Sequence, residues 1–434
     1  MEKQEYQFKN SYILIFSLLY LIQGITQSVL AVIIPIYILT ILGSVDASTI
    51  AFIGSIVGIP FILKIIFGGL TDKYGIKKLG RRKPWIIAGL TFAGLVWILM
   101  PFLITANPSS SIVIISIVGF FSMFGIAMSD TVIDGFILDI TPKEQLGRTQ
   151  GFTWGFRSAG IVLGGPVILV LMLIMPLNLI FILIGILTIV VGIFVLYIEH
   201  VEKPKEVNFF RNLKLILVKG ENWRLFSFSF FMAIIDGVLF SVISLFILIR
   251  GGLVGAEGAT LEMLEADINL YEPQAFISSI VGVGILSGAL LGGYIADLKT
   301  RKLSYYLALA VVTGSLILLI IPVPVVVLLI FVFIVGLGSG MIHSSFGSIA
   351  SGYSREYKEL RSSYFALSAS FVNMGTILGL SLTGIILDSM SGITSDTYLI
   401  YSVVFIFMAI LSMVGIIPFL TLDPKIYEHK TKKE

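Results

Sequence analysis

Residues 84–129 decide the fold class, and they read PWIIAGLTFAGLVWILMPFLITANPSSSIVIISIVGFFSMFGIAMS. The stretch carries no formal charge, and a polar turn, Asn107-Pro108-Ser109-Ser110, divides it. A helix that crosses a bilayer needs about 20 apolar residues. The stretch is long enough for two such helices, so it predicts a pair of membrane-spanning helices joined by a tight turn.

The composition extends this prediction to the whole chain. Its 434 residues are 57% hydrophobic and 13% charged, with a mean hydropathy of +1.01, whereas soluble domains carry roughly 25% charged residues. Uniform hydrophobicity over each span favours helices over a β-barrel, whose strands alternate. We therefore expect an all-α membrane protein with twelve transmembrane helices, over residues 12–41, 48–71, 84–104, 111–140, 149–173, 177–198, 223–250, 274–297, 303–321, 325–353, 362–388 and 397–420.

The distribution of charge predicts the orientation. If both termini are cytoplasmic, nearly all of the 29 Lys and Arg residues fall on the cytoplasmic side, as the positive-inside rule requires. The predicted outer loops are acidic instead. We expect a multi-pass protein of the cell (plasma) membrane with both termini inside.

The chain divides into two similar halves, 1–198 and 223–434, joined by a cytoplasmic linker, 199–222. Within the linker, residues 209–217 are amphipathic and basic, which predicts a helix along the membrane surface. An offset of 213 residues relates Gln23-Gly24 to Asp236-Gly237, Asp130 to His343, and Arg148 to Arg361. Two parallel six-helix repeats are typical of rocking secondary carriers.

Two loop motifs carry a family resemblance. Gly68-Gly69-Leu70-Thr71-Asp72-Lys73-Tyr74-Gly75, followed by Lys77 and Lys78, resembles the signature between helices 2 and 3 of the major facilitator superfamily. The segment from Asp139 to Arg148 is similar to the 4–5 loop of that superfamily. The resemblance implies the major facilitator fold, with helices 1, 4, 7 and 10 around a central cavity.

A narrower resemblance concerns the segment after the first motif. Gly80-Arg81-Arg82-Lys83-Pro84-Trp85-Ile86 resembles a segment of glycoside–cation symporters and sucrose-type carriers, as do Asp130 and Arg157. Melibiose-type members carry a pair of acids on helix 2 for the coupling cation. This chain has Lys64 in the corresponding stretch and no acid.

Charged side chains within the predicted helices mark a candidate site. Each costs at least about 2.5–3.5 kcal/mol at a helix centre unless it is paired or hydrated, and counting along the helices places them at similar depths. The alternative is a buried ion-pair network that only fixes packing. The predicted substrate and proton site comprises Gln23, Gln27, Lys64, Asp130, Asp134, Arg157, Asp236, His343 and Asn373.

The charge balance of this layer indicates proton coupling. Two cations, Lys64 and Arg157, face three acids, Asp130, Asp134 and Asp236, so one bound proton makes the layer neutral. Asp130 and Asp134 lie one helical turn apart and disfavour each other's ionisation. We expect one of these two to carry the proton, with Asp236 as a modulator.

A second set of residues predicts a gate at the cytoplasmic side. Gly68 would let helix 2 approach a neighbour closely, and Asp72 would face the start of helix 11 near Ser362 and Ser363. Arginines would pair with acids in one state and separate in the other. The predicted gate comprises Gly68, Asp72, Arg81, Arg82, Asp139, Glu144, Arg148, Asp297 and Arg361.

These features predict a secondary active transporter that works by alternating access, most simply a proton-coupled symporter of a polar solute such as a sugar. The alternatives are a proton-driven exporter of an amphipathic or drug-like compound, a uniporter, a channel or a membrane enzyme. Cys is absent and no catalytic motif is present. We therefore expect no enzymatic activity, metal or cofactor. The expected partners are a small-molecule substrate, a coupling proton or other cation, and the lipid bilayer. No nucleic acid is expected, and the protein should be a monomer.

Overall fold

The computed structural model describes residues 8–76, 78–106, 110–199, 209–265, 269–357 and 361–428. At some positions within helices, including Asp72, Glu144, Arg148 and Arg361, it describes the backbone alone. Within these ranges, twelve helices are long and apolar enough to cross a membrane, which confirms the predicted number. They span Asn10–Leu42, Ala47–Thr71, Lys83–Ile104, Ser111–Ile137, Gly155–Met172, Leu177–Tyr197, Gly220–Arg250, Tyr271–Leu298, Arg301–Leu318, Val325–Ser354, Ser363–Ser391 and Thr397–Leu420.

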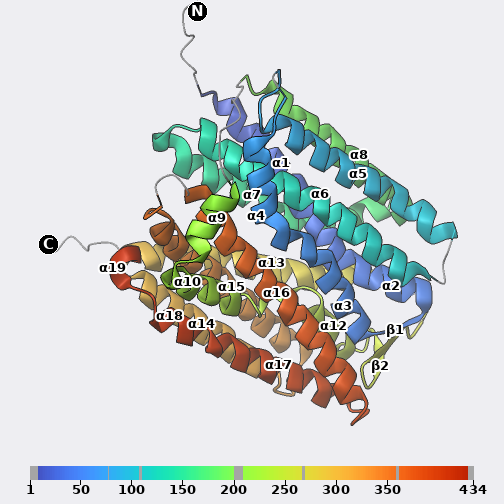
Figure 1. The fold of residues 1–434 in the computed structure, drawn as a ribbon. Coiled ribbons are helices and arrows are strands. Elements are labelled where there is room, and N and C mark those ends of the chain that lie inside the picture. Colours follow the sequence, from blue (N-terminus) through green and yellow to red (C-terminus); the bar gives the residue numbers. More distant parts are fainter. Residues whose placement is uncertain are drawn as a thin grey trace, which may run out of the picture. The chain divides into compact units, whose positions relative to one another are not determined.

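The chain packs as two compact units (Figure 1). Unit 1 comprises Met1–Val29 and Leu63–Asn212, and unit 2 comprises Leu30–Ile62 and Leu213–Glu434. The end of the first span and the beginning of the second therefore pack within the same unit as the last six spans. The predicted division of the sequence at 199–222 stays a prediction, and residues 200–208 lie outside the described ranges.

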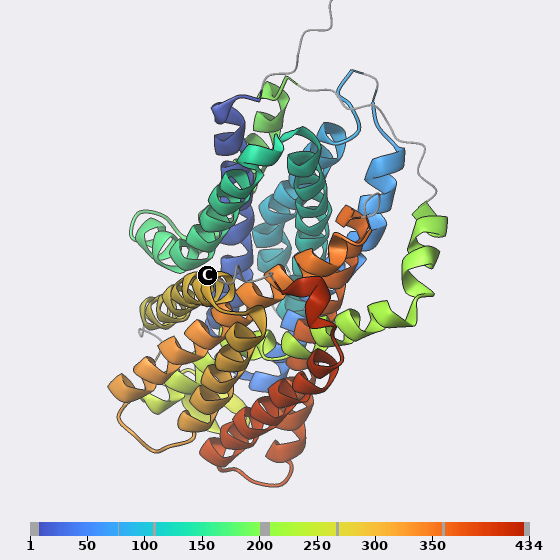
Figure 2. The same cartoon turned by 90° about the vertical axis from the view of Figure 1, so that its left-hand side faces the viewer.

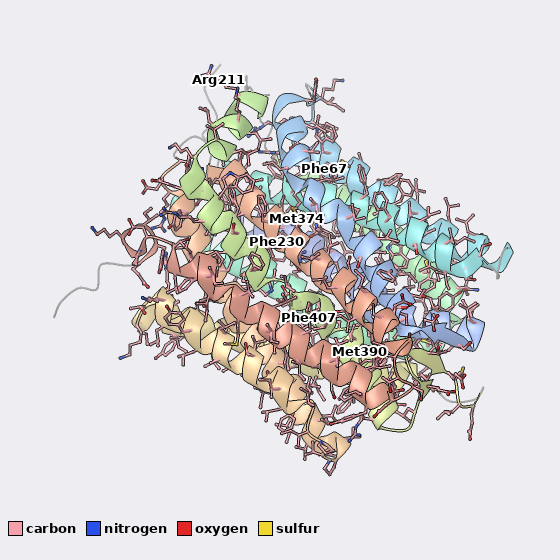
Figure 3. All side chains as sticks on the ribbon, turned by 60° about the horizontal axis from the view of Figure 1, so that its bottom comes forward. Phe67, Arg211, Phe230, Met374, Met390 and Phe407 are labelled. Carbon is pink, nitrogen blue, oxygen red and sulfur yellow. The ribbon has the colours of Figure 1, made fainter. Side chains whose placement is uncertain are left out.

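Unit 1 contains the first group of helices, α1 Asn10–Ser28, α4 Lys64–Lys73, α5 Lys83–Ala106, α6 Ser111–Ile140, α7 Lys143–Met172, α8 Leu177–Ile193 and the 3₁₀ helix Phe194–Tyr197. Helix α9, Phe209–Leu217, crosses the boundary between the units and occupies the predicted amphipathic segment. Arg211 lies on the exposed side of α9 (Figure 3).

Unit 2 contains α2 Ile34–Leu42, β1 Ser44–Asp46, α3 Ala47–Gly58, α10 Gly220–Met232, α11 Asp236–Leu239, α12 Val242–Arg250, β2 Gly255–Glu257, β3 Thr260–Glu262, α13 Tyr271–Leu298, α14 Arg301–Leu318, α15 Val325–Ser354, α16 Arg361–Ser391, α17 Thr397–Val414, α18 Ile416–Leu420 and α19 Pro424–Tyr427. Figure 2 shows α14 and α15 as a hairpin in orange tones.

Five of the predicted spans are not continuous α-helices, and the first, second and seventh are interrupted well inside the span. A π-helical turn, Val29–Ile33, separates α1 from α2, and a 3₁₀ turn, Ile59–Leu63, separates α3 from α4. Pro60 lies within the 3₁₀ turn, and Pro35 is the second residue of α2, just after the π-helical turn; the missing N–H of each proline interrupts the helical hydrogen-bond ladder. The seventh span is divided into α10, α11 and α12, and Asp236 lies directly at the first interruption.

Glycine contacts determine the helix packing in unit 1. A Cβ atom at Gly24 of α1 would collide with the Arg157 carbonyl oxygen of α7, and one at Gly160 would collide with the Leu21 carbonyl oxygen. Helix α5 packs against both α6 and α8, which lie beside it (Figure 1). Because small residues let backbones approach closely, these pairs hold α1 against α7 without a side chain between them.

Unit 2 uses equivalent contacts. A Cβ atom at Gly375 of α16 would collide with the Phe230 carbonyl oxygen of α10, and Met374 and Phe230 lie near one another in Figure 3. Helix α14 packs against α15 and α17, as α5 packs against α6 and α8 in unit 1. The glycines Gly336 and Gly340 pack α15 onto the backbone of α13. These matching helix pairs agree with the six-helix repeat in the sequence.

A three-stranded antiparallel sheet within unit 2 joins two loops far apart in the sequence. Its strand order is β1-β3-β2, with Val45 opposite Leu261 and Ser44 opposite Glu262. Two further backbone bonds extend the pairing, from Ala47 N to Ala259 O at 2.9 Å and from Met263 N to Gly43 O at 2.9 Å. Leu261 is fully buried beneath the sheet. The loop after span 1 is therefore tied to the loop after span 7.

Candidate functional site

The centre of unit 1 holds a buried cluster of opposite charges. Asp130 of α6 is fully buried and pairs with two cations: Lys64 Nζ lies 2.5 Å from its Oδ2, and Arg157 Nη1 lies 3.1 Å from its Oδ1. The Lys64 and Arg157 side chains are each 12% exposed. The structure thus brings together three charged residues that the sequence predicted to pair.

Three side chains of α1 and α6 surround this cluster. Asp134, one turn after Asp130, accepts a hydrogen bond from the Tyr20 hydroxyl. Gln27 Oε1 accepts from Arg157 Nη2 at 3.4 Å, and the Arg157 guanidinium carbon lies 5.9 Å from the centre of the Tyr20 ring. Lys64 and Arg157 therefore stand with Asp130 and Asp134 in one cluster of two cations and two acids.

Local backbone features position these groups. Lys64 is the first residue of α4, directly after the 3₁₀ turn that contains Pro60. The close approach at Gly24 and Gly160 holds α1 beside the Arg157 segment of α7, within reach of Tyr20 and Gln27. A larger residue at either glycine would separate the two helices and remove these contacts.

The side-chain amide of Gln23 in unit 1 is buried and makes no hydrogen bond to the described residues. Its side chain is fully buried, and among the described residues neither Nε2 nor Oε1 has a hydrogen-bond partner. Gln23 stands one turn from both Tyr20 and Gln27 on α1, so it lies near the helix face that meets the cluster. An unsatisfied buried amide costs about 1–3 kcal/mol.

Unit 2 contains the second group of predicted site residues. Asp236 Oδ2 lies 2.9 Å from His343 Nε2, and Asp236 Oδ1 accepts a hydrogen bond from Ser339 Oγ at 3.1 Å. Asp236 begins α11, and Ser339 and His343 lie one turn apart on α15. The predicted layer of charges is therefore two clusters, one in each unit, and the charge balance must be evaluated for each.

Asn373 of α16 has a different environment from the other predicted residues. Its Nδ2 donates to the Phe61 carbonyl oxygen at 3.2 Å. That carbonyl lies in the 3₁₀ turn Ile59–Leu63. The structure does not join Asn373 to either charged cluster.

Three of the predicted gate residues meet at the end of α6. Arg81 Nη2 pairs with Asp139 Oδ2, and Arg82 Nε lies 3.1 Å from the same oxygen. Arg82 Nη1 also donates to Thr71 Oγ1 at 3.0 Å. Arg81 and Arg82 are 1% and 5% exposed, so both guanidinium groups are buried, whereas the Asp139 side chain is 18% exposed. Of the predicted gate acids whose side chains the structure describes, Asp139 is the one that both arginines contact.

Two glycines make this arrangement possible. Gly80 has a φ of 82°, a conformation that favours glycine, and its carbonyl closes a tight turn by accepting from Ile76 N at 3.0 Å. The Arg82 guanidinium packs against Gly135, where a Cβ atom would lie 2.7 Å from its Cζ. The sequence reasoning missed Gly135, which has no local motif.

The remaining gate predictions have different outcomes. The close approach predicted at Gly68 is wrong, because a Cβ atom there would lie 3.7 Å from the Thr131 methyl group, an ordinary contact. Asp297 is exposed near the end of α13. The side chains of Asp72, Glu144, Arg148 and Arg361 lie outside the described part of the structure.

One buried arginine of unit 2 was not predicted. Arg301, at the start of α14, is 6% exposed and donates from Nη1 to the Ser348 carbonyl oxygen at 2.7 Å and to the Tyr427 carbonyl oxygen. Its backbone N–H donates to Glu428 Oε2 at 2.9 Å. Arg301 therefore ties the C-terminal helix α19 to α14 and α15. Its position at the start of a helix was the available signal.

Within the described ranges, no three His, Asp or Glu side chains come together as a metal site. In the two clusters, carboxylates and the Gln27 amide oxygen contact cations, hydroxyls and an imidazole. Such groups recognise a polar molecule or exchange a proton.

Comparison with known proteins identifies the family. The model of the Major Facilitator Superfamily matches residues 16–357 and 258–434. The chain belongs to the major facilitator superfamily. It is a multi-pass membrane transporter whose superfamily binds small molecules within the bilayer.

Individual relatives match over shorter segments. Putative transporter AmpG 1 of Rickettsia prowazekii is 36% identical over 110 residues, which are 25% of this chain and 24% of the relative. Putative transporter AmpG 3 of the same organism is 30% identical over 169 residues, 36% of this chain and 37% of the relative. The matches thus span about a quarter to a third of these relatives.

Solved structures support the fold over nearly the whole chain. A mutant of the nucleoside transporter NupG has a TM-score of 0.69 at 14% identity and covers 95% of this chain and 100% of its own. A bacterial homologue of the lysosomal transporter Spinster, inward-facing and occupied, has a TM-score of 0.66 at 15% identity, covering 96% and 97%. At these identities the likeness shows the major facilitator fold.

Proposed function

We propose that this transporter is a secondary active carrier that moves a small polar solute, such as a sugar or nucleoside, together with a proton. In this proposal it works as a monomer in the plasma membrane, with both termini cytoplasmic, and has neither a cofactor nor an enzymatic activity. The two units alternate access to the solute site by moving against each other, the mechanism typical of parallel-repeat carriers.

The cluster around Asp130 is the observation that supports a polar solute. Asp130 is fully buried beside Lys64 and Arg157, and Tyr20, Gln23 and Gln27 add hydroxyl and amide groups from α1. Ionised groups within a membrane are expensive, so they persist where they serve function. A sugar or nucleoside carries hydroxyls that both accept from cations and donate to carboxylates.

The unsatisfied amide of Gln23 adds to this argument. Its donor and acceptor atoms have no partner within the described structure, although the side chain is fully buried. A hydroxyl-rich solute offers both kinds of partner in a state of the cycle that exposes α1. An amphipathic solute would leave the amide unsatisfied, and this favours symport of a polar molecule over export of a drug-like one.

Transport by the purified protein in proteoliposomes tests the proposal. We would measure uptake of radiolabelled monosaccharides, disaccharides and nucleosides with an alkaline lumen, and repeat it without a pH gradient. The expected result is accumulation of at least one solute only when the gradient is present. Equilibration without accumulation would identify a uniporter, whereas expulsion of an amphipathic dye with no polar uptake would identify an exporter.

Asp130→Asn is the matched site variant, and Asp388→Asn, at an exposed position of α16, is its control. Uptake should fall at least about tenfold in the first, which corresponds to about 1.4 kcal/mol. Equal uptake by the two variants would place the solute elsewhere.

A further inference from the structure

The pair of Asp236 and His343 in unit 2 is a separate charged site with its own chemistry. His343 Nε2 lies 2.9 Å from Asp236 Oδ2, and Ser339 Oγ donates to Oδ1 at 3.1 Å. The His343 side chain is 40% exposed and that of Asp236 is 15% exposed. The carboxylate is therefore more enclosed than the imidazole.

The charges of the two clusters balance differently. In unit 1, Lys64 and Arg157 equal Asp130 and Asp134 in number, so that cluster is neutral with every group ionised. The unpaired negative charge of the membrane layer therefore belongs to Asp236. Its partner His343 is the one group in either cluster whose charge changes between about pH 5 and 8 in its ordinary form.

We propose that Asp236 and His343 together bind the coupling proton. This rests on the proposed function, and it places the proton in unit 2 and not at Asp130 or Asp134. One proton from solvent converts a carboxylate beside a neutral imidazole, with net charge −1, into a carboxylate–imidazolium pair with net charge zero. Release returns the proton from the imidazolium to water in another state of the cycle, and no other bond changes.

The donor set selects a proton over a metal cation. Both oxygens of Asp236 are occupied, one by an imidazole nitrogen and one by a hydroxyl donor. A hard cation such as Na⁺ requires several oxygen ligands and gains nothing from an imidazole. A proton needs only the hydrogen bond that is already present.

Other charged groups do not neutralise the pair. Helices α10, α12, α13, α14, α16 and α19 pack against α11 or α15. Their charged residues, where the structure describes the side chains, lie in the first or last turns of those helices or in the segments directly beside them. They are Lys219, Glu221, Arg224, Arg250, Glu272, Asp297, Lys299, Arg301, Lys302, Asp388, Asp423, Lys425 and Glu428, and Arg355 and Glu356 directly follow α15 itself. Arg224 precedes Asp236 by twelve residues, across the interruption between α10 and α11.

The position of Asp236 gives the proton a mechanical consequence. The next residue, Gly237, packs against α16, where a Cβ atom would lie 2.7 Å from both Thr376 O and Leu380 N. The Leu380 side chain in turn meets Gly54 of α3, where a Cβ atom would lie 3.2 Å from its Cδ1. Protonation thus occurs beside the packing of α16 on α3, which holds part of span 2 within unit 2.

Direct measurement of protonation tests the site without a known solute. The chain has three histidines, at positions 200, 343 and 429, so ¹⁵N-histidine labelling of the full protein in detergent yields three imidazole signals. His343→Gln assigns one of them. Asp236→Asn should weaken proton binding at His343 at least about tenfold, one pH unit, because the imidazolium loses its anion. Asp134→Asn should leave the His343 titration unchanged.

Two results would refute the proton site. One is a His343 titration that is unchanged in Asp236→Asn, and the other is a His343 titration that shifts in Asp134→Asn instead. Either result would leave the proposed function untouched, because the uptake assay tests pH-driven accumulation separately. Conversely, if the His343 titration depends on Asp236 but the protein never accumulates solute, the proton site stands and the proposed symport is refuted.

Thiol labelling then tests whether this proton changes conformation. The chain lacks Cys, so Ala259→Cys, 4% exposed under the sheet, reports opening of that sheet, and the exposed Glu262→Cys corrects for the thiol's own pH dependence. The ratio of their labelling rates should change between about pH 5.5 and about pH 8. It should become independent of pH in Asp236→Asn. A ratio that is constant in the parent, or equally variable in Asp236→Asn, would refute the coupling.

Discussion

Removing the charge of Asp130 is the most direct perturbation of the cluster in unit 1. Asp130→Asn preserves the shape of a side chain that is fully buried and removes the anion from two ion pairs, at 2.5 and 3.1 Å. Lys64 and Arg157, each 12% exposed, would then face Asp134 alone. Breaking a buried ion pair by removing one partner costs about 3–5 kcal/mol.

The expected change in thermal stability follows from the size of the unit. For about 150–250 residues, each kcal/mol lowers the Tm by about 2–4 °C, so Asp130→Asn should lower it by roughly 6–20 °C. We would measure unfolding of the purified protein in detergent by intrinsic fluorescence. Asp388→Asn, which is exposed, should change stability by no more than about 0.5 kcal/mol.

A second substitution separates charge from packing. Lys64→Met in the Asp130→Asn background restores neutrality, because Arg157 and Asp134 remain. The double variant should be more stable than the sum of the single losses predicts, by about 0.5–3 kcal/mol. Strictly additive losses would show that the two side chains do not interact and would refute the cluster.

Three further predictions concern packing, orientation and the sheet. Gly24→Ala would bring a Cβ atom into the Arg157 carbonyl and should destabilise the protein by at least about 1–3 kcal/mol. Gly68→Ala, which meets only a methyl group at 3.7 Å, should be tolerated. Equal melting temperatures of the two variants would contradict this. In intact cells, an impermeant maleimide should label Glu262→Cys but reach Leu213→Cys only after permeabilisation, and the reverse pattern would invert the topology. The double variant Val45→Cys and Leu261→Cys places two thiols directly opposite each other in the sheet, and they should form a disulfide. This disulfide should stop transport until a reductant is added. Undiminished transport by the oxidised protein would mean that the sheet stays closed throughout the cycle.

The sequence alone was sufficient to predict the membrane-spanning segments and to recognise one loop motif. Whether a segment such as 84–129 crosses a bilayer depends on the hydrophobicity of that segment itself, so no tertiary information is needed. The pairing of Arg81 and Arg82 with Asp139 was also accessible, because loop motifs bring nearby helix ends together. The same reasoning found the amphipathic helix at 209–217.

The partners of the buried charges were only partly accessible. Matched depth along the helices suggested that Arg157, Lys64 and Asp130 meet, and they do. The depth of a residue along its helix does not show toward which neighbour the helix turns that residue. The depth argument therefore placed Asp236 and Asp130 in one layer. The hydrogen bonds show that Asp236 belongs instead with His343 and Ser339.

Tertiary structure alone decided where glycine is required and how the first two spans pack. Gly68 carries the family motif yet has room for a methyl group, whereas Gly24, Gly135 and Gly160 face a carbonyl or a guanidinium. Residues 30–62 pack within unit 2 although they precede most of unit 1 in the sequence. Rotation, tilt and choice of neighbour depend on close contacts between helices, and in lipid those contacts are set by van der Waals packing and hydrogen bonds that hydropathy does not record.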